Sequence, residues 1–299
     1  MSQGFTGSVL MMKPRNFGFN PETAESNAFQ DATFQITGDS NLQALIEFNH
    51  AVENLRANGI DVIVAEDTEI PAKPDAIFPN NWFSTHSTGE VYLYPMLTHN
   101  RRSEVRQDVI DKIKAEFNYE KIIDLRDDYK TICEGTGSIV FDHDAKIAYA
   151  VKSSRTDPEF VADISQRLGY SPIIFEAVDE NNNDIYHTNV VMFIGPDFVV
   201  LCKACLRNGK EELIETISKS GKKIIEIDYR QMNQFAGNGI CLKNKKGEFL
   251  TILSKTAVHS LHPQQITLIQ QQSRIVEIDV SFIEKVGGGG IRCMIAELF

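Results

Sequence analysis

The last segment of the chain carries a residue with reactive side-chain chemistry, Cys293. Four glycines, residues 287–290, precede it by two positions, and the chain ends six residues after it. Glycines permit backbone torsions that other residues avoid, and they let neighbouring groups approach the main chain closely. A thiol beside such a loop is suited to be a nucleophile. The alternative is that Cys293 is a small buried filler, which is the commonest fate of a free cysteine.

Other side chains able to do chemistry stand at the start of short apolar runs. Glu134 opens EGTGS, and His187 lies in YHTNV. A thiolate can attack an electrophilic carbon, an imidazole can protonate a leaving amine and then deprotonate water, and a carboxylate accepts N–H groups. Together they predict a covalent thio-intermediate on a carbon bonded to nitrogen. The alternatives are a carboxylate that caps backbone N–H groups and a satisfied core histidine.

A repeated unit positions these residues. Five segments with helical apolar spacing are each followed by a strand-like run, and they cover residues 41–59, 103–118, 157–169, 209–221 and 262–274. In the first segment the apolar residues fall largely on one helical face, which we expect to be buried: Leu42, Leu45, Ile46, Val52 and Leu55. A hairpin-like segment follows each pair, and these segments recur every 48 to 53 residues, with starts at Asn81, Glu134, His187, Phe235 and Gly287. The near-equal steps predict five copies of one α/β unit in a single domain, residues 1–299.

The ends of the chain are expected to complete this assembly. The fifth copy stops before its second hairpin strand, and SVLMMKP (residues 8–14) has no unit of its own. We predict that SVLMMKP pairs beside MIAELF and closes a ring, which removes an exposed sheet edge. In such a ring the openings of the inner strands meet, so Cys293, His187 and Glu134 converge. Burying these groups without partners is unfavourable, which favours a nucleophile over a filler.

Composition excludes several classes of protein. A formal net charge of -11 disfavours nonspecific binding to nucleic acid or an anionic membrane, and no apolar run could span a bilayer. The first residues lack the pattern of a secretory signal, and five scattered cysteines suit a reducing compartment, so we expect a cytoplasmic location. Cys202 and Cys205 form a lone CxxC, so no metal and no cofactor are expected. A homo-oligomer is left open.

The motifs together resemble the pentein or amidinotransferase superfamily. They are GGGGIRCM, the histidine of YHTNVV, the EGTGS loop and the fivefold repeat, and the resemblance runs from VLMMKPRNFGFN through FPNNW to the terminal cysteine motif. It is strongest to the branch described as citrulline-utilisation hydrolases. The resemblance implies a five-bladed α/β propeller with pseudo-fivefold symmetry and no metal. It also implies a site of Cys293, His187 and Glu134 that acts on guanidine or urea carbons.

Two positions depart from the deiminase pattern of this superfamily, which usually has aspartates where this chain has Asn81 and Asn189. Aspartates hold a guanidinium through charge-assisted hydrogen bonds, whereas asparagine is uncharged and both donates and accepts. Amides therefore complement a neutral ureido group, and Asn81 could donate to its oxygen as charge develops there. We predict that the substrate is citrulline, hydrolysed to ornithine, ammonia and carbon dioxide. Asp75 is expected to shape the FPNNW loop rather than to react.

The α-carboxylate of such a substrate needs a cation. Arg155 in SSRT resembles the carboxylate-binding arginine of the family, and its alternative is a surface ion pair. Arg101 in NRRSEVR is a second candidate. The alternative, that Arg101 is a solvated charge at the start of a helix, is supported equally well. The sequence also does not decide between Arg101 and Arg102 as the residue that contacts the substrate. Asn81 and Asn189 could instead be turn residues with left-handed backbone torsions, without a role in substrate binding.

Three other functions compete with citrulline hydrolysis. The first is an arginine deiminase or arginine dihydrolase, because some dihydrolases bind arginine with an asparagine at the first of the two positions. The second is a non-catalytic pentein that binds a macromolecule, which would have no reason to keep the thiol, imidazole and carboxylate together. The third is a thiol peptidase, for which a closed axial site is less suitable. The expected partner is a small ureido or guanidino amino acid.

Overall fold

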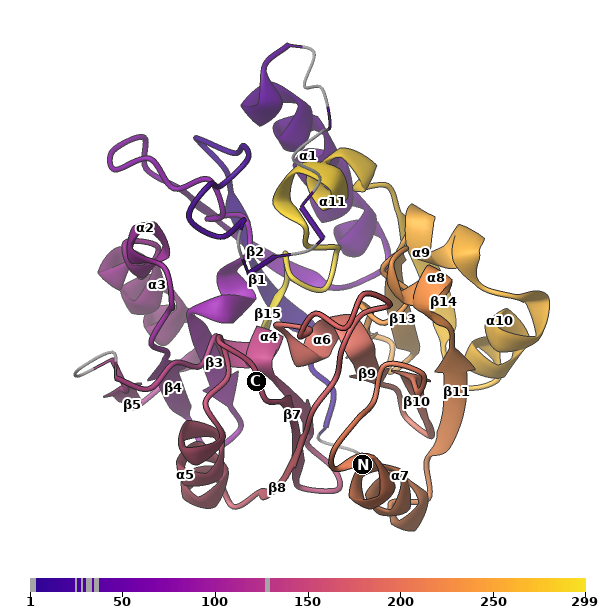
Figure 1. The fold of residues 1–299 in the computed structure, drawn as a ribbon. Coiled ribbons are helices and arrows are strands. Elements are labelled where there is room, and N and C mark those ends of the chain that lie inside the picture. The colour runs from indigo at the N-terminus through magenta and orange to yellow at the C-terminus, as the bar shows by residue number, and fades with distance from the viewer. Residues whose placement is uncertain (1–3, 25, 28, 31–33, 35–37, 127–129) are drawn as a thin grey trace.

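Five three-stranded sheets correspond to the five copies expected from the sequence (Figure 1). The structure is a computed structural model that describes residues 4–24, 26–27, 29–30, 34, 38–126 and 130–299. In spatial order the sheets are β15 (Ala296–Leu298), β1 (Ser8–Lys13), β2 (Asp61–Glu66); β3 (Phe83–His86), β4 (Glu90–Leu93), β5 (Lys121–Asp124); β6 (Ile139–Asp142), β7 (Ile147–Val151), β8 (Ser171–Phe175); β9 (Met192–Ile194), β10 (Phe198–Cys202), β11 (Lys223–Ile227); and β12 (Ile240–Lys243), β13 (Phe249–Ser254), β14 (Arg274–Ile278).

All five sheets share one pairing rule. The middle strand is antiparallel to the inner strand and parallel to the outer one. In the first sheet the middle strand is β1, which pairs Ser8 with Leu298 of β15 and Val9 with Val62 of β2. The predicted pairing of the N-terminal strand beside the C-terminal strand is therefore confirmed. Within the described residues each sheet is a separate ladder and none closes on itself, so the closed ring stays a prediction.

Long helices occupy the five segments predicted to be helical, and each precedes the outer strand of its sheet. They are α1 (Ser40–Ala57), α3 (Gln107–Phe117), α5 (Pro158–Leu168), α7 (Lys210–Lys219) and α10 (Pro263–Gln270). Short helices fill the connections: η1 (Pro79–Asn81), α2 (His99–Arg102), α4 (Gly135–Ser138), α6 (Thr188–Val191), α8 (Tyr229–Met232), α9 (Lys255–Ser260) and α11 (Ser281–Gly287). The mixed α/β class is confirmed.

Helix α1 buries part of the predicted face, because Val52 and Leu55 are in the core. Its core stripe consists of Ala44, Phe48, Ala51, Val52 and Leu55. Leu42 and Ile46 are 55% and 51% exposed, so their predicted burial is wrong. The buried residues follow the spacing of one helical face, and a stripe that includes two alanines lets the helix pack closely.

Three short helices bring the chemical groups together. Helices η1, α4 and α6 directly precede the inner strands β3, β6 and β9. Helix α4 contacts both η1 and α6, and Figure 1 shows α4 beside α6. Glu134 and His187 are the residues before the first turns of α4 and α6, so they occupy equivalent places in successive copies. The inner strands also contact one another, β15 with β3, β6 with β9, and β9 with β12.

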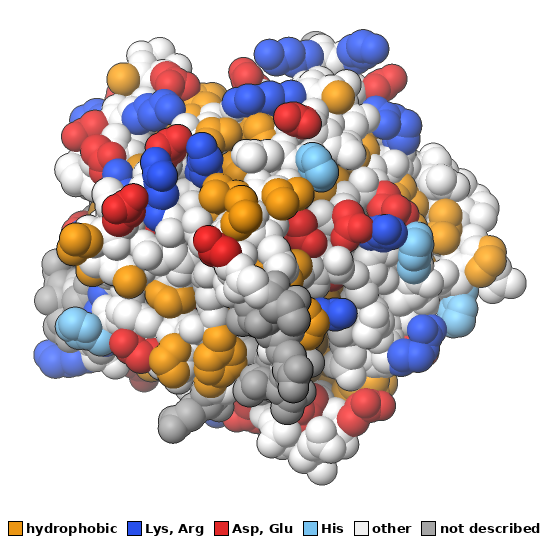
Figure 2. All heavy atoms as spheres, turned by 90° about the horizontal axis from the view of Figure 1, so that it is seen from above, with side chains coloured by type: hydrophobic (Ala, Val, Ile, Leu, Met, Phe, Trp, Pro, Cys, Tyr) orange, Lys and Arg blue, Asp and Glu red, His pale blue; other side chains and the backbone are white. Residues whose placement is uncertain are grey.

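The outer surface is charged and mixed. The face seen from above carries acidic and basic side chains among scattered apolar ones (Figure 2). Among the described residues, no helix is long and apolar enough to cross a membrane.

Candidate active site

A small cavity lies where the glycine loop meets η1 and α6. Five of the residues predicted to form the site are in its wall: Asn81, Arg101, Arg155, His187 and Cys293. Two others, Glu134 and Asn189, are buried directly behind it, within hydrogen-bonding distance of wall residues.

The glycine loop is tight because it packs against an aromatic ring. Gly288 ends α11 with φ of 67°, a left-handed torsion that favours glycine. A Cβ added at Gly287 or Gly289 would lie 2.8 or 3.0 Å from the ring of Phe78. The loop therefore brings the main chain close to Phe78, and the following turn places Cys293 in the cavity wall.

Two amides from different copies contact the thiol. The Nδ2 atoms of Asn189 and Asn238 lie 3.4 and 3.3 Å from Cys293 Sγ. Burial raises the pKa of Cys293, while these donors favour its thiolate form. Asn238 lies in the FAGNG loop, and sequence reasoning did not single it out. The signal was available, because this loop opens the inner strand of the fourth copy.

His187 is oriented by Glu134. Its Nε2 lies 2.8 Å from Glu134 Oε2, and burial lowers the pKa of His187 to about 4. Burial alone would raise the pKa of Glu134, but Arg155 and the imidazole lower it below its usual range. Glu134 also accepts the N–H of Leu97 at 3.1 Å. A neutral imidazole thus stands beside an ionised carboxylate that lies behind it rather than in the cavity wall.

The absence of a side chain at Gly137 permits this arrangement. A Cβ there would lie 2.4 Å from Asn81 Nδ2 and 2.9 Å from the ring of His187. Both contacts are closer than real Cβ atoms tolerate, so glycine allows α4 to approach these two site residues.

The wall of the cavity includes Arg101, which is buried. Its Nε and Nη2 donate to the two carboxylate oxygens of Glu104 at 2.8 and 2.9 Å, and its Nη1 donates to Asn81 Oδ1 at 3.0 Å. Burial lowers the pKa of Arg101, but the nearby carboxylates of Glu104 and Asp75 raise it more strongly. The guanidinium of Arg101 therefore stays charged. The reading of Arg101 as a solvated charge is therefore wrong. Arg102 donates instead to backbone carbonyls, and it does not line the cavity.

A second buried guanidinium belongs to Arg155. Its Nη2 donates to Ser26 Oγ at 2.7 Å, its Nη1 lies 3.4 Å from Glu134 Oε2, and it stacks over the ring of Tyr186 at 4.5 Å. Only 1% of Arg155 is exposed, so the reading as a surface ion pair is wrong.

Sequence reasoning underestimated Asp75, which lies in the cavity wall. Its Oδ2 accepts from Asn20 Nδ2 at 2.6 Å and lies 3.8 Å from Arg101 Nε. Its Oδ1 is buried and accepts no hydrogen bond from the described residues. Burial raises the pKa of Asp75, whereas Arg101 lowers it. The cavity therefore contains a carboxylate with a free oxygen, besides the two asparagines.

Both site asparagines keep one buried polar atom without a partner in the described part of the chain: the Nδ2 of Asn81 and the Oδ1 of Asn189. Neither residue has a positive φ, so the reading as left-handed turn residues is wrong. Buried polar atoms in native structures are nearly always hydrogen-bonded, and these two offer a donor and an acceptor to a ligand.

The remaining cysteines lie outside this cavity. Cys133 is buried beside Glu134 but is not in the wall, and Cys241 is also buried. Cys205 Sγ donates to the carbonyl of Cys202 at 3.0 Å. Within the described ranges, no three His, Cys, Asp or Glu side chains are grouped as metal ligands.

Known structures share this fold at low sequence identity. The apo structure of ArgZ, an arginine dihydrolase from the ornithine-ammonia cycle in cyanobacteria, matches with a TM-score of 0.77 and 15% identity over 97% of this chain and 40% of that one. The chain thus spans about 40% of the length of that protein. The substrate-bound N-terminal domain of ArgZ matches with a TM-score of 0.76 and 15% identity over 96% of both chains. A dimethylarginine dimethylaminohydrolase adduct with S-methyl-L-thiocitrulline matches with a TM-score of 0.66 and 16% identity over 98% of this chain and 100% of that one.

No curated protein sequence matches the chain. A family model described as N,N dimethylarginine dimethylhydrolase, eukaryotic, matches residues 13–299. This match covers nearly the whole chain, and the family is named for an enzyme that hydrolyses a C–N bond other than a peptide bond. The chain therefore belongs to the N,N dimethylarginine dimethylhydrolase family, within the pentein or amidinotransferase superfamily of enzymes that modify guanidino groups.

Proposed function

We propose that the protein is an arginine dihydrolase, which hydrolyses the guanidino carbon of free arginine through a covalent intermediate on Cys293. The observation that carries this proposal is one small cavity that contains the thiol, the imidazole of His187, two buried guanidinium groups and the free oxygen of Asp75. The proposal differs from the citrulline hydrolysis expected from the sequence, because Asp75 adds a negative charge that this expectation left out.

In the first step the thiol of Cys293 gives its proton to His187, and the resulting thiolate attacks the guanidino carbon. His187, held by Glu134, then passes this proton to the departing nitrogen, and ammonia leaves. Water then adds to the thio-bound carbon, His187 takes its proton, and the C–S bond breaks to release citrulline and the thiolate. A second round on the ureido carbon yields a second ammonia, carbon dioxide and ornithine.

The charge of the site favours arginine over citrulline as the first substrate. Three buried carboxylates, those of Asp75, Glu104 and Glu134, lie near two guanidinium groups, those of Arg101 and Arg155. Burial raises the pKa of Asp75 and of Glu104, so a further cation in the cavity would favour their ionised forms. The side chain of arginine supplies such a cation, whereas the side chain of citrulline is neutral.

The two asparagines suit the second round. Once the guanidino group has become a ureido group, its oxygen can accept from the free Nδ2 of Asn81 and its N–H can donate to the free Oδ1 of Asn189. Neither amide repels the neutral group, as a second carboxylate would repel its oxygen. The same cavity can therefore hold the first substrate and the intermediate product.

The α-carboxylate of the substrate is assigned to the positive charges in the cavity wall. Arg155 is the first candidate, as its resemblance to the family suggests, and Arg101 is the second. Arg101 reaches Asn81 as well, so it links carboxylate binding to the amide that contacts the reacting group.

Separate incubations with arginine, citrulline and N,N-dimethylarginine test the proposal, with citrulline, ornithine, ammonia and dimethylamine measured in each. We expect two ammonia per ornithine from arginine, and one from citrulline. Accumulation of citrulline alone from arginine would make the enzyme a deiminase. Release of dimethylamine with no consumption of arginine would instead assign the activity that the family name describes.

Citrulline hydrolysis alone is the second candidate. The observation that favours it is the pair Asn81 and Asn189, which lack the charge that usually holds a guanidinium. Consumption of citrulline with arginine left intact would establish it in place of the first proposal.

We also infer that the five sheets are the blades of one closed ring that forms a single domain from residue 1 to 299. Contacts between inner strands of neighbouring sheets and the β1–β15 pairing support this arrangement. Deletion of residues 1–14 removes the middle strand of one sheet, so we expect it to abolish the cooperative unfolding transition in urea. A transition as sharp as that of the full chain would refute ring closure.

A further inference from the structure

A second small cavity lies on the other side of the segment that carries the thiol. Its wall is formed by parts of β6, β9 and β12, by residues 4 and 5, and by Arg292 and Glu297. It shares no lining residue with the active-site cavity. The two cavities are therefore separate, although Arg292 and Cys293 are neighbours in the chain.

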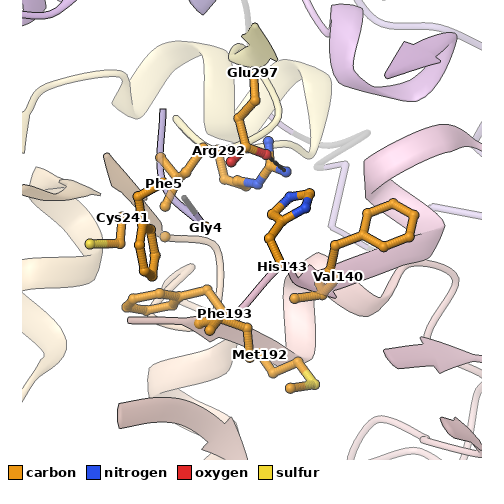
Figure 3. Close-up of a pocket in the computed structure, with 13 residues that line it drawn as sticks. Gly4, Phe5, Val140, His143, Met192, Phe193, Cys241, Arg292 and Glu297 are labelled. Atoms are coloured by element: carbon orange, nitrogen blue, oxygen red, sulfur yellow. Dashed lines mark hydrogen bonds and ion pairs between the residues drawn. The ribbon is translucent and has the colours of Figure 1, made fainter. Parts of the chain in front are cut away.

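The wall of the second cavity has apolar side chains on one side and charged or polar side chains at one end. Figure 3 shows Arg292, Glu297 and His143 close together, with the rings of Phe5 and Phe193 on another side. The apolar part also includes Met192, Ile194 and Ile240. Such a wall binds an apolar group and orients it through a few polar atoms.

The charged end has unused hydrogen-bonding capacity. Arg292 Nη2 donates to Glu297 Oε2 at 3.0 Å, and Arg292 Nη1 donates to the carbonyl of Ile295 at 2.8 Å. The side chains of the pair are only 8% and 15% exposed. A guanidinium has five N–H groups; in the described part of the chain, only Nη1 and Nη2 of Arg292 donate, and the second carboxylate oxygen of Glu297 accepts nothing.

The third polar group at this end is neutral. His143 Nδ1 bonds the hydroxyl of Tyr170 at 2.7 Å, and burial lowers the pKa of His143 to about 3. Burial raises the pKa of Glu297, and Arg292 lowers it by less, so the pKa lies above its usual value. One guanidinium and one carboxylate thus face the cavity, and a ligand with one charge of each sign would complement them.

We propose that this cavity is a second ligand site, which binds a free α-amino acid with an apolar side chain. The carboxylate of the ligand accepts hydrogen bonds from the free N–H groups of Arg292, and its ammonium donates to the free oxygen of Glu297. The side chain packs against Phe5 and Phe193. This site does not depend on the reaction proposed for the first cavity, because its binding can be measured without turnover.

Occupancy of this site is linked to the active site through two chain segments. Arg292 precedes Cys293, and its hydrogen bond to the carbonyl of Ile295 closes the turn that holds the thiol. Asn238, which contacts the thiol, precedes Gly239 in the wall of the second cavity. We therefore expect a bound ligand to change the rate at which iodoacetamide alkylates Cys293, followed by mass spectrometry of the cysteine-containing peptide. An unchanged rate at saturating ligand would refute this linkage.

Calorimetric titration with L-leucine tests the site, on the full chain and on the chain whose Cys293 has been carbamidomethylated to fill the first cavity. We expect saturable binding of one leucine per chain in both. Absence of binding would overturn the proposal. Binding that disappears after alkylation would also overturn it, because leucine would then occupy the active-site cavity.

Ligand analogues and matched variants test the recognition itself. Leucinamide lacks the carboxylate and 4-methylpentanoate lacks the ammonium, so each should bind at least about tenfold more weakly than leucine. Glu297→Gln should weaken leucine binding to a similar degree, whereas the exposed control Glu277→Gln should not. Equal affinity for all three ligands would contradict the proposal even if Glu297→Gln fails to fold.

Discussion

Two neighbouring residues line two different cavities: Cys293 lies in the wall of the active-site cavity, and Arg292 lies in the wall of the second cavity. The active-site cavity is surrounded by a network of carboxylates and guanidinium groups, whereas the second cavity combines apolar side chains with an ion pair. Glu134 is fully buried and yet has a lowered pKa, while the less deeply buried Glu297 has a raised one. Burial alone therefore does not determine whether a carboxyl group is ionised. Nearby cationic groups decide it here, because Arg155, Arg101 and His187 lie close to Glu134 and lower its pKa.

The thiols of the two cavities give the largest expected contrast. Cys293→Ser should lower kcat for arginine by roughly a thousandfold or more, because it replaces the proposed nucleophile. Cys241→Ser, its control in the wall of the second cavity, should leave kcat within about threefold. Steady-state ammonia release measures both, with thermal unfolding as a check on folding. Activity of the serine variant at position 293 close to wild type would remove Cys293 from the mechanism.

The two buried glutamates sharpen the comparison. Glu134→Gln should lower kcat by about a hundredfold, because the imidazole loses the carboxylate that orients it and stabilises its protonated form. Glu297→Gln should change kcat by less than about threefold in the absence of ligand. Comparable losses in the two variants, at equal melting temperatures, would mean that Glu134 has no special role in the reaction.

The pH dependence of stability reports on His187. Its pKa is lowered to about 4 by burial, so the folded chain holds the imidazole neutral while the unfolded chain protonates it near its ordinary value of 6.5. The contribution of His187 to stability is therefore complete above pH 6.5 and is lost as pH falls toward 4, by about 3 kcal/mol. Urea unfolding of wild type and His187→Gln between pH 8 and pH 4.5 should show a weaker loss in the variant. Parallel curves would contradict the assignment.

The smallest effect is expected at Asp75, the carboxylate of the active-site cavity with a free oxygen. Asp75→Asn should raise KM for arginine by about tenfold, because the substrate cation loses one opposite charge. KM for citrulline, whose side chain is neutral, should rise less. A larger rise for citrulline than for arginine would show that Asp75 recognises the part that both substrates share.

Much of the fold could be predicted because it depends on local patterns. Apolar spacing located the five long helices, and turn residues located the hairpins that became β3–β4, β6–β7, β9–β10 and β12–β13. The same patterns misplaced Leu42 and Ile46, because the face that α1 buries depends on the surface it packs against. Periodicity also did not reveal the short helices η1, α4 and α6, which are too short to show a stripe.

The site was predictable in its residue types but not in its contacts. The repeat spacing predicted that Cys293 and His187 lie close together, and both are in the wall of the active-site cavity. Asp75 was set aside because a carboxylate before a loop has no distinctive local pattern. Asn238 was missed although it lies at the opening of the fourth inner strand, because the residue type alone does not mark this asparagine as a hydrogen-bond partner of the thiol.

By itself, the sequence determined the five α/β copies, the strand that completes the last one, and the set of reactive side chains. These follow from periodicity and residue chemistry, which each segment carries locally. Only the tertiary structure decided which carboxylate orients the imidazole, that Asp75 faces the cavity, and that Arg292 and Cys293 face different cavities. Those properties depend on distances between segments far apart in the chain, and the ionisation of a buried group changes with each charge placed near it.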